Sequence, residues 1–146
     1  ARFTSPQRSG DSAVDAHTIA LDGVGGDWYG RPGSVRFRGL ARAESEGGRV
    51  STDGGTLTVE GADAATLVIS LATSYRNYLD VGADPAARAR NHLAPAARKP
   101  YAHLRDRHVA DHRRLFGRVA LDLGPSERAE LPTDERIPLF ADGKDP

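Results

Sequence analysis

The chain has 146 residues, which suits one domain with its own core and is short for two ordinary domains. Its 20 basic and 20 acidic residues balance, so no overall field indicates nucleic acid or a membrane surface as a partner. Cysteine is absent, which excludes disulfides and thiolate metal sites. No apolar run approaches the roughly 20 residues that span a bilayer. The sequence has no P-loop or dinucleotide fingerprint, and we predict no cofactor.

Residues 1–17 are polar and show no periodicity, which predicts a loop or a poorly ordered end. Residues 18–80 instead predict short strands. Residues 34–43 alternate between apolar and polar side chains, as in a half-buried strand. Asp53-Gly54-Gly55 predicts a hairpin, because glycine supplies the positive φ that such turns require. Residues 65–71, ATLVISL, are almost continuously apolar and predict an interior strand of a sheet.

Residues 81–118 predict a helical linker. Asp84 can cap a helix whose first residue is Pro85, where the missing N–H costs nothing. Pro95 should kink this helix or begin a new turn. We therefore expect the first helix to end at about residue 93 or 94.

A second helix is predicted over residues 101–116, and the alternation at residues 119–123 then predicts a strand before a proline-broken acidic tail. The fold class is thus α+β: a partial antiparallel β-sandwich over residues 18–80, a helical linker over residues 81–118 and a short closing strand within residues 119–146. The strands number four or five, whereas free-standing sandwiches usually have seven or more. We therefore expect the sheet to be incomplete.

Basic residues concentrate in the helical linker. Residues 85–118 hold nine Arg or Lys against Asp106 and Asp111, whereas residues 1–84 and 119–146 are both net acidic. One interpretation is a solvated helix face, and the other is a docking surface for an acidic neighbouring domain. Nucleic acid fits poorly, because no aromatic residues are interleaved for base stacking.

Two histidines of the second predicted helix could share a metal ion. His108 and His112 lie at i and i+4, and Asp111 falls on the same face. The segment HVADH lacks the Glu that a zincin helix uses as base, and its surroundings supply no dedicated third ligand. We assign no metal site, favour a structural role at a contact with another domain, and keep His108 and His112 as weak metal candidates.

Aromatic and polar residues gather after the most apolar strand. Tyr75, Arg76, Asn77 and Tyr78 directly follow it, and Trp28 lies in an earlier glycine-rich loop. Such groups suit the faces and hydroxyls of sugars, which makes these five residues weak candidates for substrate binding. The alternative is a strand-to-helix crossover held by side-chain hydrogen bonds.

Glycoside hydrolysis uses pairs of carboxylates, and the chain has two pairs to consider, Glu44 with Glu46 and Asp134 with Glu135. Neither pair has an apolar environment in the sequence that would raise one pKa. We predict that both pairs are solvated and assign no catalytic residue.

Four segments, in this order, carry a resemblance to a known family: EGGRVSTDGGTLTVEGADAATL, ATSYRN, HVADHRRLFGRV-LDLG and LPTDER. From about Thr18 to Ile137 the chain resembles the amino-terminal region of bacterial glycoside hydrolase family 95, the α-L-fucosidases. Each segment alone would be weak, and their combination is specific. His112 departs from the pattern, because such proteins often have Tyr there, and this weakens a metal role further.

The resemblance implies a multi-domain parent enzyme with an N-terminal β-sandwich, a helical linker, an (α/α)6 catalytic barrel and a C-terminal β domain. It implies inverting hydrolysis of terminal α-L-fucosides by a Glu acid and an Asp base assisted by Asn, all in the barrel. No residue of this chain matches those catalytic positions. The chain is therefore expected to be a non-catalytic N-terminal portion that starts inside the sandwich and stops as the barrel begins.

The expected partners are the catalytic barrel of the parent and, through the parent, fucosylated glycans. A sheet separated from its other strands and from the barrel should expose apolar patches and favour self-association. The resemblance implies a bacterial protein, secreted or cytoplasmic. The alternative function is a free-standing carbohydrate-binding or interaction module.

Overall fold

The computed structural model of the chain describes residues 1–122, 124, 130–141 and 143. These residues divide into two compact units, within residues 1–107 and within residues 108–146. Among the described residues, no helix is long and apolar enough to cross a membrane.

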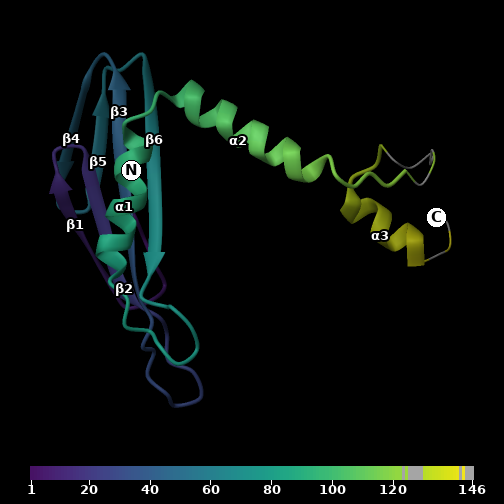
Figure 1. Ribbon diagram of the computed structural model, residues 1–146, viewed down its shortest axis with the longest axis horizontal. Helices are drawn as coiled ribbons and strands as arrows, with labels where there is room; N and C mark the ends of the chain where they lie inside the picture. Colours follow the sequence, from purple (N-terminus) through teal and green to yellow (C-terminus); the bar gives the residue numbers. More distant parts are fainter. Residues whose placement is uncertain (123, 125–129, 142, 144–146) are drawn as a thin grey trace. The chain divides into compact units, whose positions relative to one another are not determined.

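The first unit is built from antiparallel strands. These are β1 (Ser9–Asp15), β2 (Thr18–Val24), β3 (Arg36–Glu46), β4 (Arg49–Asp53), β5 (Thr56–Glu60) and β6 (Ala64–Thr73). Four of them form one sheet in the order β1-β2-β3-β6, and β4 pairs with β5 in a separate hairpin. Figure 1 shows the hairpin and the helix α1 (Pro85–Ala97) beside this sheet. The fold is α+β with a partial antiparallel β-sandwich, as predicted.

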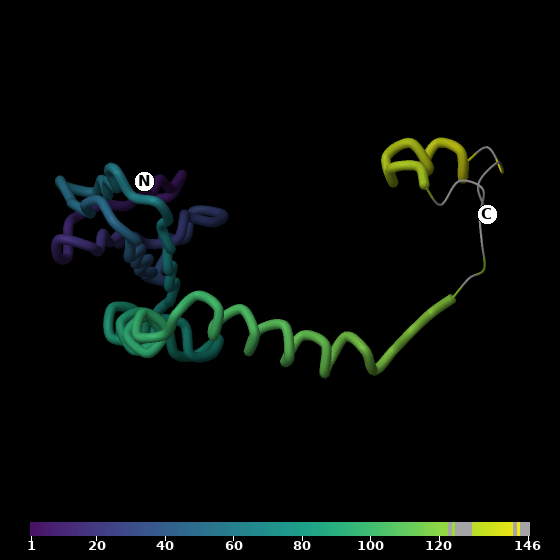
Figure 2. The backbone as a smooth tube through the Cα atoms, turned by 90° about the horizontal axis from the view of Figure 1, so that it is seen from above, coloured from purple at the N-terminus to yellow at the C-terminus, as the bar shows by residue number. Residues whose placement is uncertain are grey.

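The four-stranded sheet separates two small cores, because alternate residues of a strand point to opposite faces. On one face Ile19 packs with residues of β3 and of the β4–β5 hairpin, including Val50 and Leu57. On the other face Ala20 of the same strand and Leu40 pack against α1. The first unit therefore has three layers, hairpin, sheet and helix, and Figure 2 shows α1 alongside the strands.

Helix α1 begins where the sequence predicts. The Asp84 carboxylate accepts hydrogen bonds from the backbone N–H of Ala86 and Ala87, and Pro85 occupies the first turn. The helix continues to Ala97, so the expected end near residue 93 or 94 is wrong. Pro95 lies within its last turn and removes a single hydrogen bond there, which does not end the helix.

The N-terminal segment differs from the expectation of a loop over residues 1–17. Residues 9–15 form β1, which pairs with β2 from Ser9 opposite Gly23 to Asp15 opposite Thr18. Six of its seven residues are exposed, so the strand has no apolar periodicity to reveal it. Pairing with β2, rather than local preference, makes this segment a strand.

The apolar segment 65–71 also differs from the prediction. It lies in β6, which is the last strand of the sheet order and not an interior strand. Leu67, Ile69 and Leu71 are 45%, 52% and 70% exposed. An apolar run is typical of a strand that is buried on both faces. Among the described residues, only one face of β6 is covered.

Helix α2 (Tyr101–Phe116) begins within the first unit and ends within the second, which also contains helix α3 (Thr133–Ala141). The described residues 119–122 form no strand, so the predicted closing strand is wrong there, and residue 123 lies outside the described residues. A five-residue strand forms only where a neighbouring strand can pair with its backbone groups. Alternation of apolar and polar residues does not by itself provide such a neighbour. Helix α3 was not predicted; Asp134 and Glu135 lie in its first turn, where carboxylates favour a helix start.

Candidate functional site

Two connecting loops leave the same end of the four-stranded sheet. β2 ends at Val24, β3 begins at Arg36 and β6 ends at Thr73, and these antiparallel neighbours place residues 25–35 and 74–84 at one end. Both loops lie at the lower end of the sheet in Figure 1. All five residues predicted as weak sugar contacts belong to these two loops.

The first loop presents a pair of aromatic rings. Trp28 and Arg31 exchange two backbone hydrogen bonds of 3.0 Å, which close a tight turn. Tyr29 and Gly30 between them have φ angles of 46° and 73°, both in the left-handed region that glycine adopts easily and tyrosine does not. The Trp28 and Tyr29 side chains are 75% and 91% exposed, and their ring centroids lie 5.1 Å apart, edge to face. Residue type does not predict a left-handed backbone at this tyrosine.

The second loop uses its polar residues internally. Arg76 Nη1 donates to Asp80 Oδ2 at 2.9 Å, and Asn77 Oδ1 accepts from the Leu79 N–H at 2.9 Å. Asn77 also pairs with Asp80 through the backbone. The hydrogen bond from the Gly82 N–H, and then that from Arg76, lower the pKa of the Asp80 carboxyl below its ordinary value. Arg76 and Asn77 thus hold the turn together.

The base of the second loop is fixed to the sheet and to α1. Ser74 is fully buried, and its hydroxyl accepts from the Arg36 backbone N–H at 2.9 Å. Arg88 of α1 donates to the carbonyl oxygens of Thr73 and Tyr75 at 2.9 and 2.7 Å. These contacts favour the crossover interpretation for this segment. Tyr78 stays 85% exposed and free for an external contact.

The histidine candidates lie in a row along α2. The rings of His108 and His112 have centroids 6.2 Å apart, and His112 stacks on Phe116 at 5.1 Å. Asp111 instead pairs with Arg114, with 2.9 Å between Oδ1 and Nη2. Within the described part of the chain, no group of three or more His, Cys, Asp or Glu could hold a metal ion. This arrangement favours ring packing over ligation.

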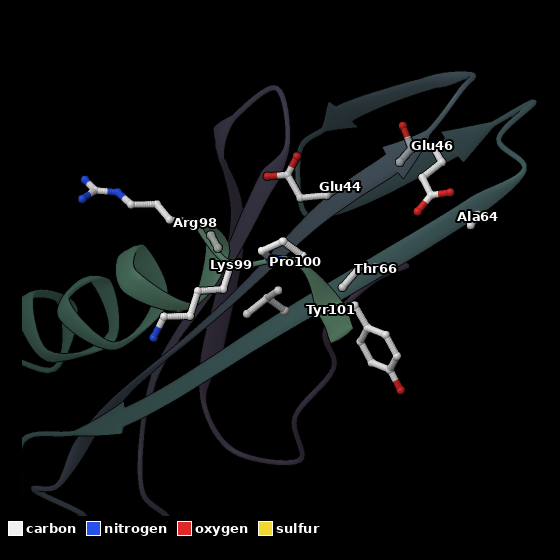
Figure 3. A pocket seen from close by; sticks show the side chains of 11 residues that line it. Glu44, Glu46, Ala64, Thr66, Arg98, Lys99, Pro100 and Tyr101 are labelled. Atoms are coloured by element: carbon white, nitrogen blue, oxygen red, sulfur yellow. The ribbon is translucent and has the colours of Figure 1, made fainter. Parts of the chain in front are cut away.

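Glu44 and Glu46 line an open pocket of about 360 Å³ beside Thr66, Lys99 and Tyr101, which Figure 3 shows. The Glu44 carboxylate accepts from Arg42 Nε at 2.7 Å. This carboxylate is thus bound by an arginine of its own strand.

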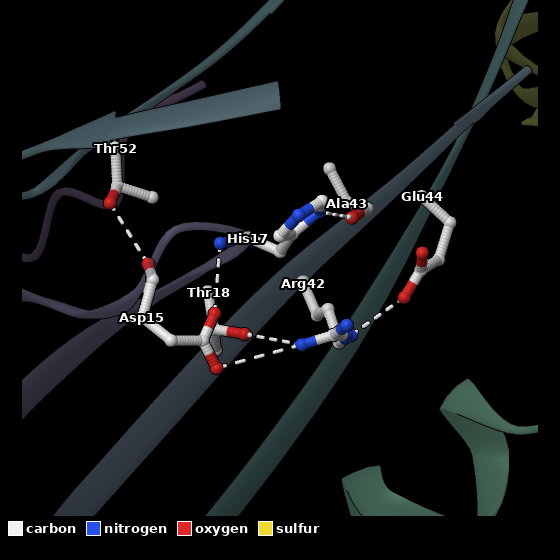
Figure 4. Close-up of polar contacts among 7 residues, drawn as sticks. All are labelled: Asp15, His17, Thr18, Arg42, Ala43, Glu44 and Thr52. Atoms are coloured by element: carbon white, nitrogen blue, oxygen red, sulfur yellow. Dashed lines mark hydrogen bonds and ion pairs between the residues drawn. The ribbon is translucent and has the colours of Figure 1, made fainter. Parts of the chain in front are cut away.

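Arg42 joins this pair to a larger polar network, drawn in Figure 4. Its guanidinium also lies 3.5 Å from the Asp15 carboxylate and 3.3 Å from Thr18 Oγ1. The Asp15 carbonyl oxygen accepts from Thr52 Oγ1 at 2.9 Å, which ties the β1–β2 turn to the hairpin. Sequence reasoning missed this network, whose only signal is an arginine on the polar face of a strand.

Comparisons with known proteins place the chain among glycoside hydrolases. Residues 1–78 match the model of the glycosyl hydrolase family 65 N-terminal domain, and residues 100–146 match that of the glycosyl hydrolase family 95 catalytic domain. Alpha-L-fucosidase 2 of Arabidopsis thaliana is 34% identical over 112 residues, which cover 70% of this chain and 13% of that protein. More than half of the chain therefore belongs to the N-terminal domain of glycosyl hydrolase family 65, and the chain as a whole is similar to glycoside hydrolase family 95 enzymes.

Proposed function

We propose that the chain is a non-catalytic N-terminal portion of a glycoside hydrolase that removes terminal α-L-fucose with inversion. The observation that carries this proposal is the order of the two family matches, an N-terminal domain over residues 1–78 and then a catalytic domain over residues 100–146. The named relative, an α-L-fucosidase, supports fucosides as the substrate class. Residues 18–80 serve as the sandwich, residues 81–118 as the linker, and the remainder leads into the catalytic domain.

The surface of α2 supports a docking role for the linker. None of its residues is buried, and three of its large apolar side chains lie open to solvent. Tyr101, Leu115 and Phe116 are 63%, 49% and 75% exposed. Exposed aromatic and aliphatic side chains on a basic helix suit a partner that is apolar with an acidic rim. The catalytic barrel of the parent enzyme is the partner we assign to this helix.

The reading frame that encodes the chain provides the test. We expect it to continue in frame into a helical barrel domain that carries a Glu and an Asp flanking the scissile bond. A stop codon directly after the codon for Pro146 would contradict the proposal and favour a free-standing module.

A second candidate function is direct carbohydrate contact at the first loop. The observation that favours it is the left-handed, 91% exposed Tyr29 beside an exposed Trp28, because strained backbone is kept where function needs it. Trp28 is the chain's single tryptophan, so its fluorescence reports on this loop alone.

Titration with L-fucose and with a fucosylated oligosaccharide should change that fluorescence saturably. Tyr29→Ala should weaken the response at least tenfold, whereas Tyr101→Ala should leave it unchanged. A fluorescence that does not respond to either sugar would exclude this candidate.

A further inference from the structure

A polar pocket lies on the α1 side of the sheet, where β3 ends and β6 begins. Glu44 and Glu46 of β3 lie opposite Thr66 and Ala64 of β6 in the antiparallel register. Every second residue of a strand points to the same face, so the two glutamates share their face with Leu40, which packs against α1. The pocket of about 360 Å³ is therefore on the helix side of the sheet, and all its lining residues belong to the first compact unit.

The strand side of this pocket offers hydrogen-bond acceptors. The Glu44 side chain hydrogen-bonds to Arg42 through Oε1 alone. The Glu46 carboxylate has no hydrogen bond or ion pair with any described residue. Thr66 adds a hydroxyl beside them. Acceptor capacity therefore remains free on both glutamates.

The linker side offers donors and an aromatic ring. Arg98 ends α1 as its C-cap, and Lys99 follows it. Neither side chain has a hydrogen bond or ion pair within the described part of the chain. Tyr101 starts α2 and is 63% exposed. Figure 3 shows these three side chains extending from the linker, and the two glutamates from β3.

The space continues along α1 into a second hollow of about 400 Å³. The two hollows share Glu44, Ala97 and Arg98. Binding sites for small ligands in proteins are commonly about 300–1,000 Å³ in volume. The pocket therefore has room for one small cyclic ligand, and the adjoining hollow has room for a second unit of the same size.

Carboxylates and cations that line one pocket without pairing suit a neutral ligand rich in hydroxyl groups. No ion pair among the described residues joins either glutamate to Arg98 or Lys99. A hydroxyl both donates and accepts, so the hydroxyls of one sugar ring can bind carboxylates and cations together. The apolar face of that ring can stack on a tyrosine. An anion or a cation would instead meet like charges on one side of the pocket.

We propose that this pocket binds a neutral sugar residue, with Glu44 and Glu46 as acceptors, Arg98 and Lys99 as donors and Tyr101 as the stacking ring. A further protein segment is a poorer occupant, because covering these charges without partners of opposite sign costs free energy. The aliphatic opposite face of β6 suits such a segment better.

The pocket is distinct from the loop of Trp28 and from the docking surface of α2. β3 begins beside that loop at Arg36, and the pocket lies at its other end, at residues 44–46. Leu115 and Phe116 do not line the pocket and remain available to the catalytic barrel. Sugar binding here does not depend on the hydrolase function, so either proposal stands if the other fails.

Amide chemical shifts of the isotope-labelled chain test the site. We expect methyl α-L-fucoside and methyl β-D-galactoside to shift the signals of residues 44–46, 64–68 and 97–101 saturably, with millimolar affinity. Added salt should not weaken this binding, because the sugars carry no charge. The proposal would be overturned by tighter binding of glucuronate or glycine, by shifts confined to residues 25–35, or by no saturable shift with either sugar.

Matched variants assign the contacts. Glu46→Gln replaces a charge-assisted hydrogen bond by a neutral one and should weaken binding about tenfold. Tyr101→Ala removes the ring and should weaken binding by about as much. Asp53→Asn makes a carboxylate-to-amide change at the end of β4, and Phe140→Ala removes an exposed ring of α3, so both should bind like the parent chain. Equal affinities of all four variants would overturn the assignment, and circular dichroism confirms that each is folded.

Discussion

Ser74 fixes the point where β6 turns toward α1. Its side chain is fully buried and accepts the Arg36 backbone N–H, while its own N–H and carbonyl bind Arg36 and Ala83. Ser74→Ala removes the hydroxyl and leaves the partly buried Arg36 N–H without its acceptor, which costs about 1 kcal/mol. Urea unfolding measures this loss. Ser12→Ala, at an exposed position of β1, serves as the control, and equal stabilities of the two variants would contradict a stabilising role for this hydrogen bond.

Tyr29 holds a backbone conformation that suits glycine. With φ at 46°, a tyrosine in this region stores about 1 kcal/mol or more of strain. Tyr29→Gly should therefore raise the free energy of unfolding by about 1 kcal/mol while it removes the exposed ring. A thermal melt measures the gain, and Tyr78→Gly, whose backbone is not left-handed, should give none. A loss of stability in Tyr29→Gly would show that the ring supports the fold.

Asp84 makes α1 sensitive to acid. The hydrogen bond from the Ala87 N–H, with that from Ala86, lowers the pKa of the Asp84 carboxyl below its ordinary value. Its stabilisation is therefore present above the ordinary carboxyl pKa and is lost as pH falls through the lowered value. Asp84→Ala should melt below the parent chain at neutral pH, and the difference should shrink in acid. A difference that is constant with pH would contradict this cap, and Asp106→Ala provides the control.

Residue-level features were predictable where chemistry is local. The Asp84 cap and the hydrogen-bonded crossover at Tyr75–Asn77 follow from residue types and spacing, and the structure contains both sets of contacts. The left-handed Tyr29 and the Arg42 network were not predictable. Both depend on strands that the sequence places far apart or on a turn type that usually requires glycine.

Helix α1 is the element that covers one face of the sheet. Leu93 is 7% exposed and packs with Ala20 and Leu40 across that interface. Leu93→Ala should cost about 2–4 kcal/mol, because it removes buried methyl groups and leaves a cavity. Phe116→Ala, at a side chain 75% exposed, should stay within about 0.5 kcal/mol of the parent. Chemical denaturation measures both, and similar small losses would mean that α1 is not docked.

Elements were predictable where their own pattern is strong. The alternating strand β3, the hairpin at residues 53–55 and both linker helices follow from periodicity and turn residues. β1 escaped prediction because its residues are polar and exposed. The position of β6 escaped it because an apolar run does not say whether a neighbour is present on each side.

At the scale of the whole molecule, the described residues form folded elements. They do not bring together an assembled catalytic centre. Its carboxylates at Glu44, Asp80 and Asp111 are each paired with an arginine. The family matches assign residues 1–78 to an N-terminal domain and residues 100–146 to a catalytic domain. Charge balance and length predicted neither these two domains nor the parent family. The four sequence segments between residues 46 and 136, taken in their order along the chain, did predict them.

The central claim is that this chain supports a hydrolase without carrying its chemistry. Incubation of the purified chain with an aryl α-L-fucoside, beside an active α-L-fucosidase as the positive control, tests it most directly. We predict that the chain releases no aryl alcohol above the rate in buffer. Turnover that scales with the concentration of the chain, and that survives repeated purification, would contradict the account.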